Sequence, residues 1–365
     1  MKPRVLFVGR TRYRLPLDPA VAPKWEALGR ELDVRVVGTA APDSAPGDGT
    51  FRLVPRRRVL DGPRFWAGLP VRVAREIRGF RPEAIVTQTA YEAAAALAAR
   101  RLTRSDARVV LEVHGDWRTS TRLYGSPARR ALGGLGDRIA AWAVRRADVV
   151  RTVSPFTSSL VRELGVEPAA TFPAYMHLEP FVERPPAPLP EQPVALFVGV
   201  LEAYKNVDGL AAAWRLVAPR APDATLRIVG RGTRTDVVES LVHDLPAQTR
   251  WDKRLSADEV VRALDDATVL VLPSRSEGMG RVLVEAFCRG RGVVGTRAGS
   301  IPDLVEDGVN GLLVEPGDEA ALADAIVRVL TEPGLAERLG EAARERAASW
   351  LQTPDEYAAR VRALV

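Results

Sequence analysis

The chain has 365 residues, of which 46% are hydrophobic and 27% are charged, and its formal net charge is +6. This composition excludes a disordered or collagen-like chain, and the length exceeds what one hydrophobic core usually organises, so we expect two domains. No run of about eighteen uncharged apolar residues is present, which argues against a membrane-spanning helix. The N-terminus runs directly into an apolar strand-like segment without a secretory pattern, and this predicts a cytoplasmic protein.

The two halves of the chain differ in charge. Residues 1–183 contain 30 basic and 19 acidic residues, whereas the remainder contains 22 and 27. The asymmetry favours a first half that faces an anionic surface or substrate, although an arginine-rich composition accounts for it equally well. No zinc-finger, RNA-recognition or helix-turn-helix signature is present, so we expect no nucleic-acid partner.

Short apolar strands alternate with helical segments along the first half. These predicted strands are 4–9, 32–38, 84–88, 107–115 and 147–154. A proline-rich stretch at 184–193 is typical of a linker, and the pattern then restarts. The predicted strands of the second half are 194–199, 224–230, 268–273, 292–296 and 311–315.

This repeated pattern predicts an α/β fold with two doubly wound Rossmann-like domains that face a central cleft. The predicted domains are residues 1–183 and 194–350, and a C-terminal helix at about 351–365 is expected to pack back on the first domain. Ligands of such sheets bind outside the carboxyl ends of the strands.

The stretch "LPSRSEGMGRVLVEAFCRG" (272–290) combines a buried strand, a small-residue turn and a helix. The strand ends at Pro273, and the apolar spacing from Val282 onward predicts the helix. The small residues of the turn are Ser274, Ser276, Gly278 and Gly280. Such a turn lets backbone amides approach a diphosphate, with Glu277 in the turn and Glu285 one helical turn further, where it can accept ribose hydroxyl bonds. An ordinary turn with a capping acid also explains this stretch by itself.

The stretch does not stand alone. "EGMGRVLVE" is followed by "RGRGVVGTRAGSIPDLVEDGVNGLLVEPGD" and preceded by "FVGVLEAYKNVDGLAAAW" and "LRIVGRG", and the first half contains "VLEVHGDW", "ADVVRTVSPFTSSLVRELGV" and "FPAYMHLEPF". Together these segments resemble the family 4 glycosyltransferases, which are retaining enzymes of the two-domain GT-B fold. The resemblance implies transfer of a sugar from a nucleoside-diphosphate donor to an acceptor hydroxyl.

The same resemblance implies roles for individual residues. Glu277 would lie against the transferred sugar, Glu285 would bind the ribose, and Lys205 would hold the donor diphosphate. His114 would line the sugar pocket, with a core histidine as the alternative. The other donor-binding residues that it implies are Gly199, Gly230, Arg231, Gly232, Arg275, Gly278, Met279, Gly280, Arg281 and Val282.

One departure concerns the diphosphate site. Many members of the family have an arginine where this chain has Val200, so the second cation is expected to come from Arg231, Arg275 or Arg281. No Asp-x-Asp motif occurs in the chain. We therefore expect no catalytic metal and no cofactor besides the donor substrate.

A second departure lies on the acceptor side. The sequence "GRTRYRLPL" (9–17) replaces the family's glycine-rich loop, and its side chains could grip phosphates or stack on a sugar, or stay solvated. The candidate acceptor-side residues are Arg10, Arg12, Tyr13, Arg14 and, less strongly because it also suits a helix N-cap, Asp116.

The segment "RFWAGLPVRVAREIRGFRP" (64–82) mixes aromatic and aliphatic residues with arginines. It suits a helix that lies peripherally on the inner face of an anionic membrane and reaches a lipid-linked acceptor, and it equally suits a core-facing helix with a basic outer side. The acceptor is then lipid-linked or an anionic glycan. Two rival functions stay open: a nucleotide-sugar epimerase of the same architecture, and an inactive sugar-binding protein in which Val200 replaces a needed cation.

Overall fold

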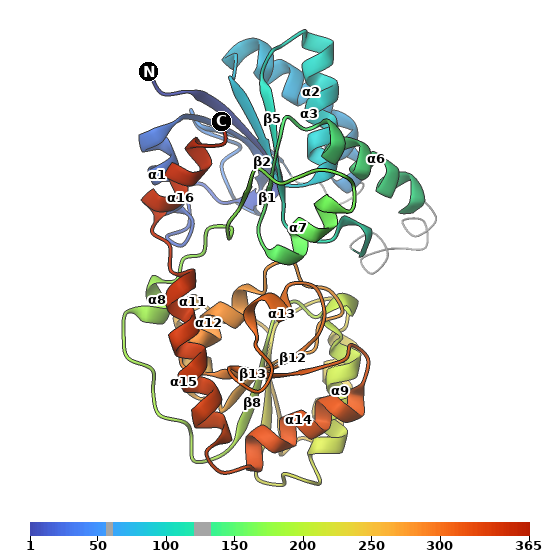
Figure 1. The fold of residues 1–365 in the computed structure, drawn as a ribbon, viewed down its shortest axis with the longest axis vertical. Helices are drawn as coiled ribbons and strands as arrows, with labels where there is room; N and C mark the ends of the chain where they lie inside the picture. Colours follow the sequence, from blue (N-terminus) through green and yellow to red (C-terminus); the bar gives the residue numbers. More distant parts are fainter. Residues whose placement is uncertain (56–60, 120–132) are drawn as a thin grey trace. The chain divides into compact units, whose positions relative to one another are not determined.

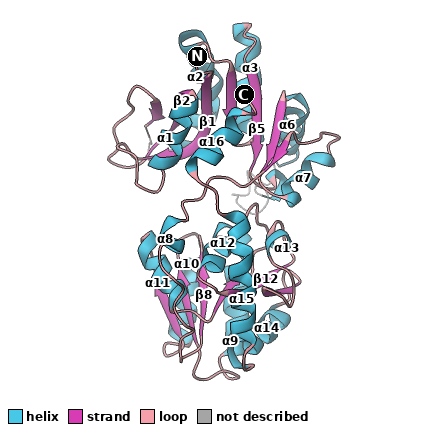
Figure 2. Ribbon diagram, turned by 60° about the vertical axis from the view of Figure 1, so that its left-hand side comes forward, coloured by secondary structure: helices cyan, strands magenta, loops and turns pink. Residues whose placement is uncertain are grey.

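The computed structural model describes residues 1–55, 61–119 and 133–365 (Figure 1). The described chain forms two compact units: one runs to His177 and includes Gln352–Val365, and the other comprises Leu178–Leu351. Each unit contains one parallel sheet with helices in most of its connections (Figure 2). The prediction of two doubly wound α/β folds is therefore confirmed.

The first unit has a seven-stranded sheet in the order β3-β2-β1-β4-β5-β6-β7. The strands are β1 (Arg4–Tyr13), β2 (Asp33–Ala40), β3 (Phe51–Val54), β4 (Ala84–Thr87), β5 (Arg108–Val113), β6 (Val149–Thr152) and β7 (Ala170–Thr171). The strand order reverses between β1 and β4, which is the place where such sheets bind ligands.

Helices cover both faces of this sheet. They are α1 (Ala22–Glu31), α2 (Asp61–Phe80), α3 (Ala90–Thr103), α6 (Gly133–Arg146), α7 (Pro155–Arg162) and α16 (Pro354–Arg362). Alternate residues of β1 point to opposite faces: Leu6 and Val8 pack with α2, α3 and α6, whereas Val5 and Phe7 pack with α1 and α16.

The C-terminal helix α16 lies beside α1 (Figures 1 and 2). Thr353 caps it in a reciprocal capping box, and Tyr357 is buried in the same cluster as Trp25. Ion pairs from Arg30 to Asp355 and from Arg362 to Glu31 flank the contact. The end of the chain is thus part of the first unit.

The second unit has a six-stranded sheet in the order β10-β9-β8-β11-β12-β13. The strands are β8 (Val194–Val198), β9 (Thr225–Val229), β10 (Thr249–Asp252), β11 (Val269–Leu272), β12 (Gly292–Thr296) and β13 (Gly311–Val314). The helices are α8 (Glu179–Val182), α9 (Val207–Val217), α10 (Thr235–Asp244), α11 (Ala257–Asp265), α12 (Arg281–Cys288), α13 (Ile301–Leu304), α14 (Glu319–Thr331) and α15 (Leu335–Ala347), with 3₁₀ turns η1 (Ala203–Lys205) and η2 (Ala348–Trp350).

The sequence predicts that the proline-rich stretch is a solvated linker. In the structure this stretch is bound to the second unit. The buried guanidinium of Arg289 donates to the carbonyls of Phe181, Arg184 and Pro185, and pairs with Asp265. Arg291 donates to the carbonyls of residues 187 and 188. Residues 178–193 therefore follow the second unit because two buried arginines need backbone acceptors that this stretch supplies.

Two further differences from the predicted elements have physical causes. The edge strands β3, β7 and β10 were not predicted, because "FRLV" and "TRWD" are short and interrupted by charged residues and β7 has only two residues. The strand β1 was predicted to end at Gly9, but it continues through a bulge to Tyr13, with Arg12 and Tyr13 paired to β2. Among the helices of the described ranges, none is long and apolar enough to cross a membrane.

Candidate functional site

The turn between β11 and α12 has the predicted strand-turn-helix form. The strand is fully buried and ends at Leu272, and α12 begins at Arg281 with Gly280 as its N-cap residue in the left-handed conformation (φ 62°). Val282 and Leu283 anchor the helix in the core. The amide of Leu283 donates to the Gly280 carbonyl at 2.8 Å, whereas no helix carbonyl lies one turn before Arg281 or Val282, so the amides of these two residues face an acceptor at the helix N-terminus.

The structure brings Lys205 and Glu277 together in the second unit. Lys205 ends the 3₁₀ turn η1 that follows β8, and its Nζ forms an ion pair with Glu277 Oε2 in the β11–α12 turn. The two side chains are only 10% and 14% exposed. The cation expected for the diphosphate and the acid expected for the sugar are therefore direct neighbours.

Backbone contacts fix the two loops that carry this pair. The amide of Arg275 donates to the carbonyl of Tyr204 at 2.7 Å, and its guanidinium Nε donates to Asn206 Oδ1 at 3.1 Å. On the other side, the Glu277 carbonyl accepts from the amide of Ser300 at 2.9 Å. Gly299 (φ 59°) lies so close that an added Cβ would be 2.1 Å from that carbonyl oxygen. No local sequence pattern indicates the part played by residues 299 and 300.

Glu285 lies one turn into α12, as the apolar spacing predicts. Burial raises the pKa of its carboxyl group above the ordinary value, against a smaller opposing effect of the Arg281 charge. Arg281 itself is exposed, with its Nη2 3.9 Å from Glu285 Oε1. A carboxylate that is mostly buried and has only one distant cation retains capacity to accept hydrogen bonds from a ligand.

The glycines Gly230 and Gly232 allow the loop after β9 to pack directly on the loop after β8. A Cβ on Gly230 would lie 1.8 Å from the carbonyl oxygen of Gly199. In the same region Val200 is 46% exposed, and Arg231 Nε donates to the carbonyl of Lys253 at 3.1 Å. The residue at the position of the family's arginine thus extends into solvent, while Arg231 is held at the neighbouring loop.

His114 follows β5 in the first unit and contacts Glu112, which forms an ion pair with Arg151. These contacts were not predicted from the sequence. The Nε2 of His114 lies 3.3 Å from Glu112 Oε2, and Glu112 Oε1 accepts from the buried guanidinium of Arg151. Burial alone would raise the pKa of Glu112, but Arg151 and the His114 contact outweigh it, so that pKa lies well below its ordinary value. The ionised Glu112 therefore orients the His114 ring. The contact between Glu112 and His114 could have been predicted, because residues two apart along a strand lie on the same face.

His114 and Asp116 line a cavity of about 270 Å³ at the carboxyl ends of β4 and β5. Three aromatic residues form much of its wall: Trp66 from α2, Tyr91 from α3, and Trp117. Asp116 also accepts from the amide of Arg118 and from Thr119 Oγ1, which is the predicted capping alternative. A wall of aromatic rings with a few polar groups suits a sugar ring, whose apolar face stacks on aromatics.

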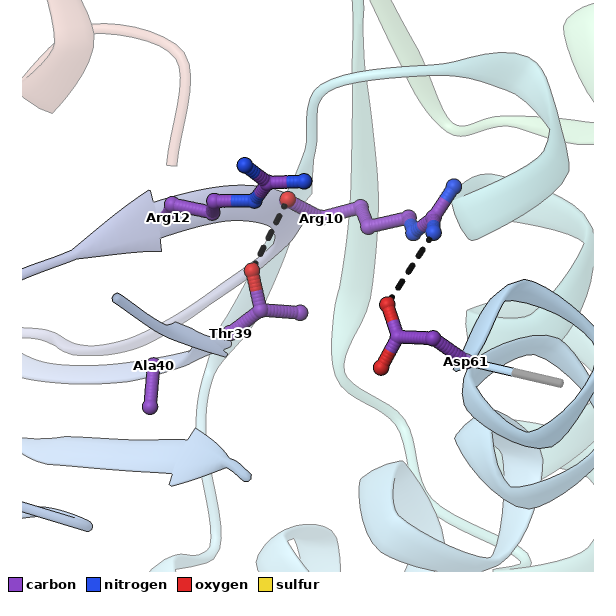
Figure 3. Close-up of a pocket in the computed structure, with 5 residues that line it drawn as sticks. All are labelled: Arg10, Arg12, Thr39, Ala40 and Asp61. Atoms are coloured by element: carbon purple, nitrogen blue, oxygen red, sulfur yellow. Dashed lines mark hydrogen bonds and ion pairs between the residues drawn. The ribbon is translucent and has the colours of Figure 1, made fainter. Parts of the chain in front are cut away.

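Arg10 and Arg12 line a second cavity of about 200 Å³ with Thr39, Ala40 and Asp61. Figure 3 shows the Arg10 side chain directed toward Asp61, with 3.4 Å between the charged groups, and Thr39 Oγ1 bonded to the Arg10 carbonyl. The exposed Arg14 is not among the lining residues.

The prediction for Tyr13 was wrong. Because β1 continues to this residue, its ring is buried and packs against Trp25 and Phe51. Burial raises the pKa of the Tyr13 hydroxyl far above its ordinary value. A ring in this position cannot stack on a ligand.

The helix α2 contains most of the segment 64–82, for which a membrane-facing and a core-facing orientation were both predicted. Its apolar residues Phe65, Leu69, Val73 and Ile77 are buried in the core of the first unit. The core-facing alternative is therefore confirmed, and this apolar face is not available to a membrane. In the parts of the chain that the structure describes, no cluster of three His, Cys, Asp or Glu side chains is arranged to hold a metal ion.

Two family models match successive parts of the chain. The model of Glycosyltransferase Family 4 matches residues 25–173, and the model of Glycosyl transferases group 1 matches residues 182–346. A glycogen synthase of Mycobacterium tuberculosis is 29% identical over 298 residues, which cover 78% of this chain and 68% of that protein.

Solved structures share the fold over the whole chain. Sucrose-phosphate synthase from Thermosynechococcus elongatus has a TM-score of 0.81 at 20% identity and covers 99% of both chains. Anabaena HepE, solved in complex with UDP-glucose, has a TM-score of 0.73 at 17% identity and covers 99% of this chain and 100% of its own. At these identities the likeness concerns the fold alone.

Proposed function

The chain belongs to glycosyltransferase family 4 and has the GT-B fold, and we propose that it transfers a sugar, with retention at the anomeric carbon, from a nucleoside diphosphate to an acceptor hydroxyl. The observation that carries this proposal is the Lys205–Glu277 ion pair beside the N-terminus of α12. A buried cation and the amides at a helix N-terminus form an arrangement suited to a diphosphate leaving group.

In the proposed reaction the bond from the anomeric carbon to the diphosphate oxygen breaks, the acceptor oxygen bonds to that carbon, and the acceptor hydroxyl proton passes to the departing diphosphate. Negative charge then accumulates on the diphosphate, where fixed positive groups lower the barrier. Lys205 and the α12 amides would receive this charge without a metal, with Arg231, Arg275 and Arg281 as candidate additional cations. Glu277 would hold the sugar, and Glu285 would accept the ribose hydroxyl bonds.

We propose a nucleotide-sugar as the donor class because the fold is that of a protein solved with UDP-glucose, and because Glu285 is a buried acceptor at the predicted ribose position. On the acceptor side, the aromatic cavity that contains His114 is suited to a sugar ring, whereas the cavity of Arg10 and Arg12 is suited to an anionic group. An acceptor that carries both would be an anionic or lipid-phosphate-linked glycan.

A donor screen tests the proposal. Thermal unfolding is measured with UDP-, GDP- and ADP-sugars, and a true donor at 100 times its dissociation constant stabilises the protein by about 2.7 kcal/mol. With that donor, Lys205→Met and Glu277→Gln should each lower turnover at least about tenfold, or roughly 1.4 kcal/mol of barrier. The exposed Lys2→Met and Glu337→Gln are matched controls with unchanged turnover.

Three outcomes contradict the proposal. No stabilisation by any nucleotide-sugar removes the donor, and unchanged turnover in both site variants removes the site. Conversion of the donor sugar in the absence of any acceptor would favour the epimerase.

A further inference from the structure

A third cavity of the first unit is lined by four arginines. It measures about 360 Å³ and lies between β3 and α2. Arg52 comes from β3, and Arg64, Arg72 and Arg75 come from α2. Since a water molecule takes up about 30 Å³ of the liquid, the cavity has room for a phosphate ester rather than for a single water.

The packing of α2 sets these arginines side by side. Buried apolar residues, among them Phe65 and Leu69, fix the rotation of the helix against the core. The guanidinium of Arg72 folds back along the helix, lies against Gly68, and donates from Nη1 to the carbonyl of Phe65 at 3.1 Å. Within the described ranges this is the one hydrogen bond of the Arg72 side chain, so its other N–H groups remain able to donate.

The charge of this cavity is not balanced by its own lining. Its single carboxylate, Glu76, is engaged by Arg35 at 3.1 Å. Across the described ranges, none of the four lining arginines forms an ion pair with a carboxylate, and Arg52 donates only to the carbonyl of Asp48. Burial lowers the pKa of Arg72, and the neighbouring positive charges of Arg64 and Arg75 lower it further. Like charges held this close repel each other, and an anion would relieve that repulsion.

Arginine is suited to this task because its planar fork matches two phosphate oxygens at once. The remaining lining includes Pro46, Leu53 and Val54, which offer an apolar wall beside the cations. We propose that this arginine pocket binds the phosphate group of a phosphate ester, at a site separate from the proposed donor-binding turn. The ester is either a soluble phosphorylated molecule or the headgroup of a phospholipid, and both present the same group to the pocket.

Glycerol 3-phosphate is the soluble probe, and its binding to the full-length protein is measured by titration calorimetry. The test variant carries Arg64→Gln, Arg72→Gln and Arg75→Gln. The control carries Arg78→Gln, Arg101→Gln and Arg146→Gln, which removes three exposed positive charges from the same unit outside the pocket. The test variant should lose at least about tenfold in affinity, because it removes most of the charge-assisted bonds, whereas the control should keep its affinity within about twofold.

Lys205→Met distinguishes binding in this pocket from binding at the donor turn, because it should leave the affinity for glycerol 3-phosphate unchanged. Sedimentation with phosphatidylcholine vesicles, with and without phosphatidic acid, tests the lipid source in the same variants. Binding to either probe that depends on the three pocket arginines supports the proposal, and the probe that binds identifies the source. Equal losses in test and control variants, loss in Lys205→Met alone, or no binding of wild type to either probe would overturn it. Thermal unfolding confirms that each variant is folded.

Discussion

The Lys205–Glu277 ion pair makes a prediction about stability that is independent of catalysis. Both side chains are almost buried, so replacing one partner leaves an opposite charge without compensation. Breaking a fully buried pair in this way costs roughly 3–5 kcal/mol. Because these side chains keep a small exposure, we expect Lys205→Met or Glu277→Gln to lower the free energy of unfolding by about 2–3 kcal/mol. For a domain of this size, about 2–4 °C is lost per kcal/mol, which gives a shift of about 4–12 °C.

The double variant removes both charges together. Because no charge is then left without its partner, the Lys205→Met/Glu277→Gln protein should lie within about 1 kcal/mol of wild type, and the coupling energy should be about 3 kcal/mol or more. Calorimetric unfolding of the four proteins measures this cycle. Turnover with the identified donor should stay low in all three variants, so stability and activity separate in the double variant.

The exposed pair between Arg220 and Asp324 is the control. Its side chains are 46% and 64% exposed, so the corresponding cycle with Arg220→Met and Asp324→Asn should give a coupling of at most about 1 kcal/mol. Additive destabilisation in the Lys205–Glu277 cycle, or a double variant less stable than either single variant, would refute the inference that the two charges compensate each other. A double variant with wild-type turnover would refute their proposed roles.

Three further predictions concern other parts of the structure. Gly299→Ala should abolish turnover because its Cβ would lie 2.1 Å from the Glu277 carbonyl oxygen. Gly308 also has a positive φ, of 77°, but an added Cβ there would meet nothing within 4 Å, so Gly308→Ala should lose only backbone-strain energy of about 1 kcal/mol. Similar turnover in both variants would exclude the steric cause. Burial raises the pKa of Glu92 from 4.5 to about 7, so the folded protein keeps a proton that the unfolded chain releases, and the stability from this group is lost as pH rises from about 4.5 to 7. In Glu92→Gln, the fall in the free energy of unfolding between pH 5 and pH 8, measured with urea, should be smaller than in wild type by up to about 3 kcal/mol. An unchanged dependence on pH contradicts this. Arg289→Met should release residues 183–193 from the second unit, so limited proteolysis within them should be faster than in wild type. Arg344→Met, a control at an exposed residue of α15, should be cleaved at the wild-type rate. Equal rates in the two variants would show that Arg289 does not hold the stretch.

The sequence predicted those elements whose signal is local. Ten strands are apolar runs flanked by helical segments, and all ten occur in the two sheets. The turn at 273–280 was predictable for the same reason, since small residues separate a buried strand from a periodic helix. The edge strands β3, β7 and β10 were not predicted, because an edge strand can be short, needs little apolar surface and often carries charges.

Contacts between distant residues escaped for a different reason. Lys205 and Glu277 are 72 positions apart, and a resemblance can assign each a role without revealing that they touch. The Glu112–Arg151 pair behind His114 likewise joins two strands, and Tyr13 was misjudged because a bulge carried β1 four residues further than the apolar run indicated. In each case tertiary pairing, which has no local pattern, decided the outcome.

The ion pair also bears on the missing arginine at Val200. Because Glu277 offsets part of the Lys205 charge, Lys205 and the α12 amides need further positive charge to balance a diphosphate. Of the three arginines considered for this charge, Arg275 bonds a neutral amide and Arg231 bonds a backbone carbonyl, whereas Arg281 lies 3.9 Å from a carboxylate oxygen of Glu285. If the proposed function is correct, the guanidiniums of Arg275 and Arg231 supply the charge that the family's arginine supplies elsewhere. Replacing Arg275 by Gln should therefore raise the donor KM more than Val200→Arg lowers it, because Val200 extends into solvent and the new charge would be screened there. A larger effect of Val200→Arg, measured by initial rates at low donor concentration, would show that the second cation is truly lacking.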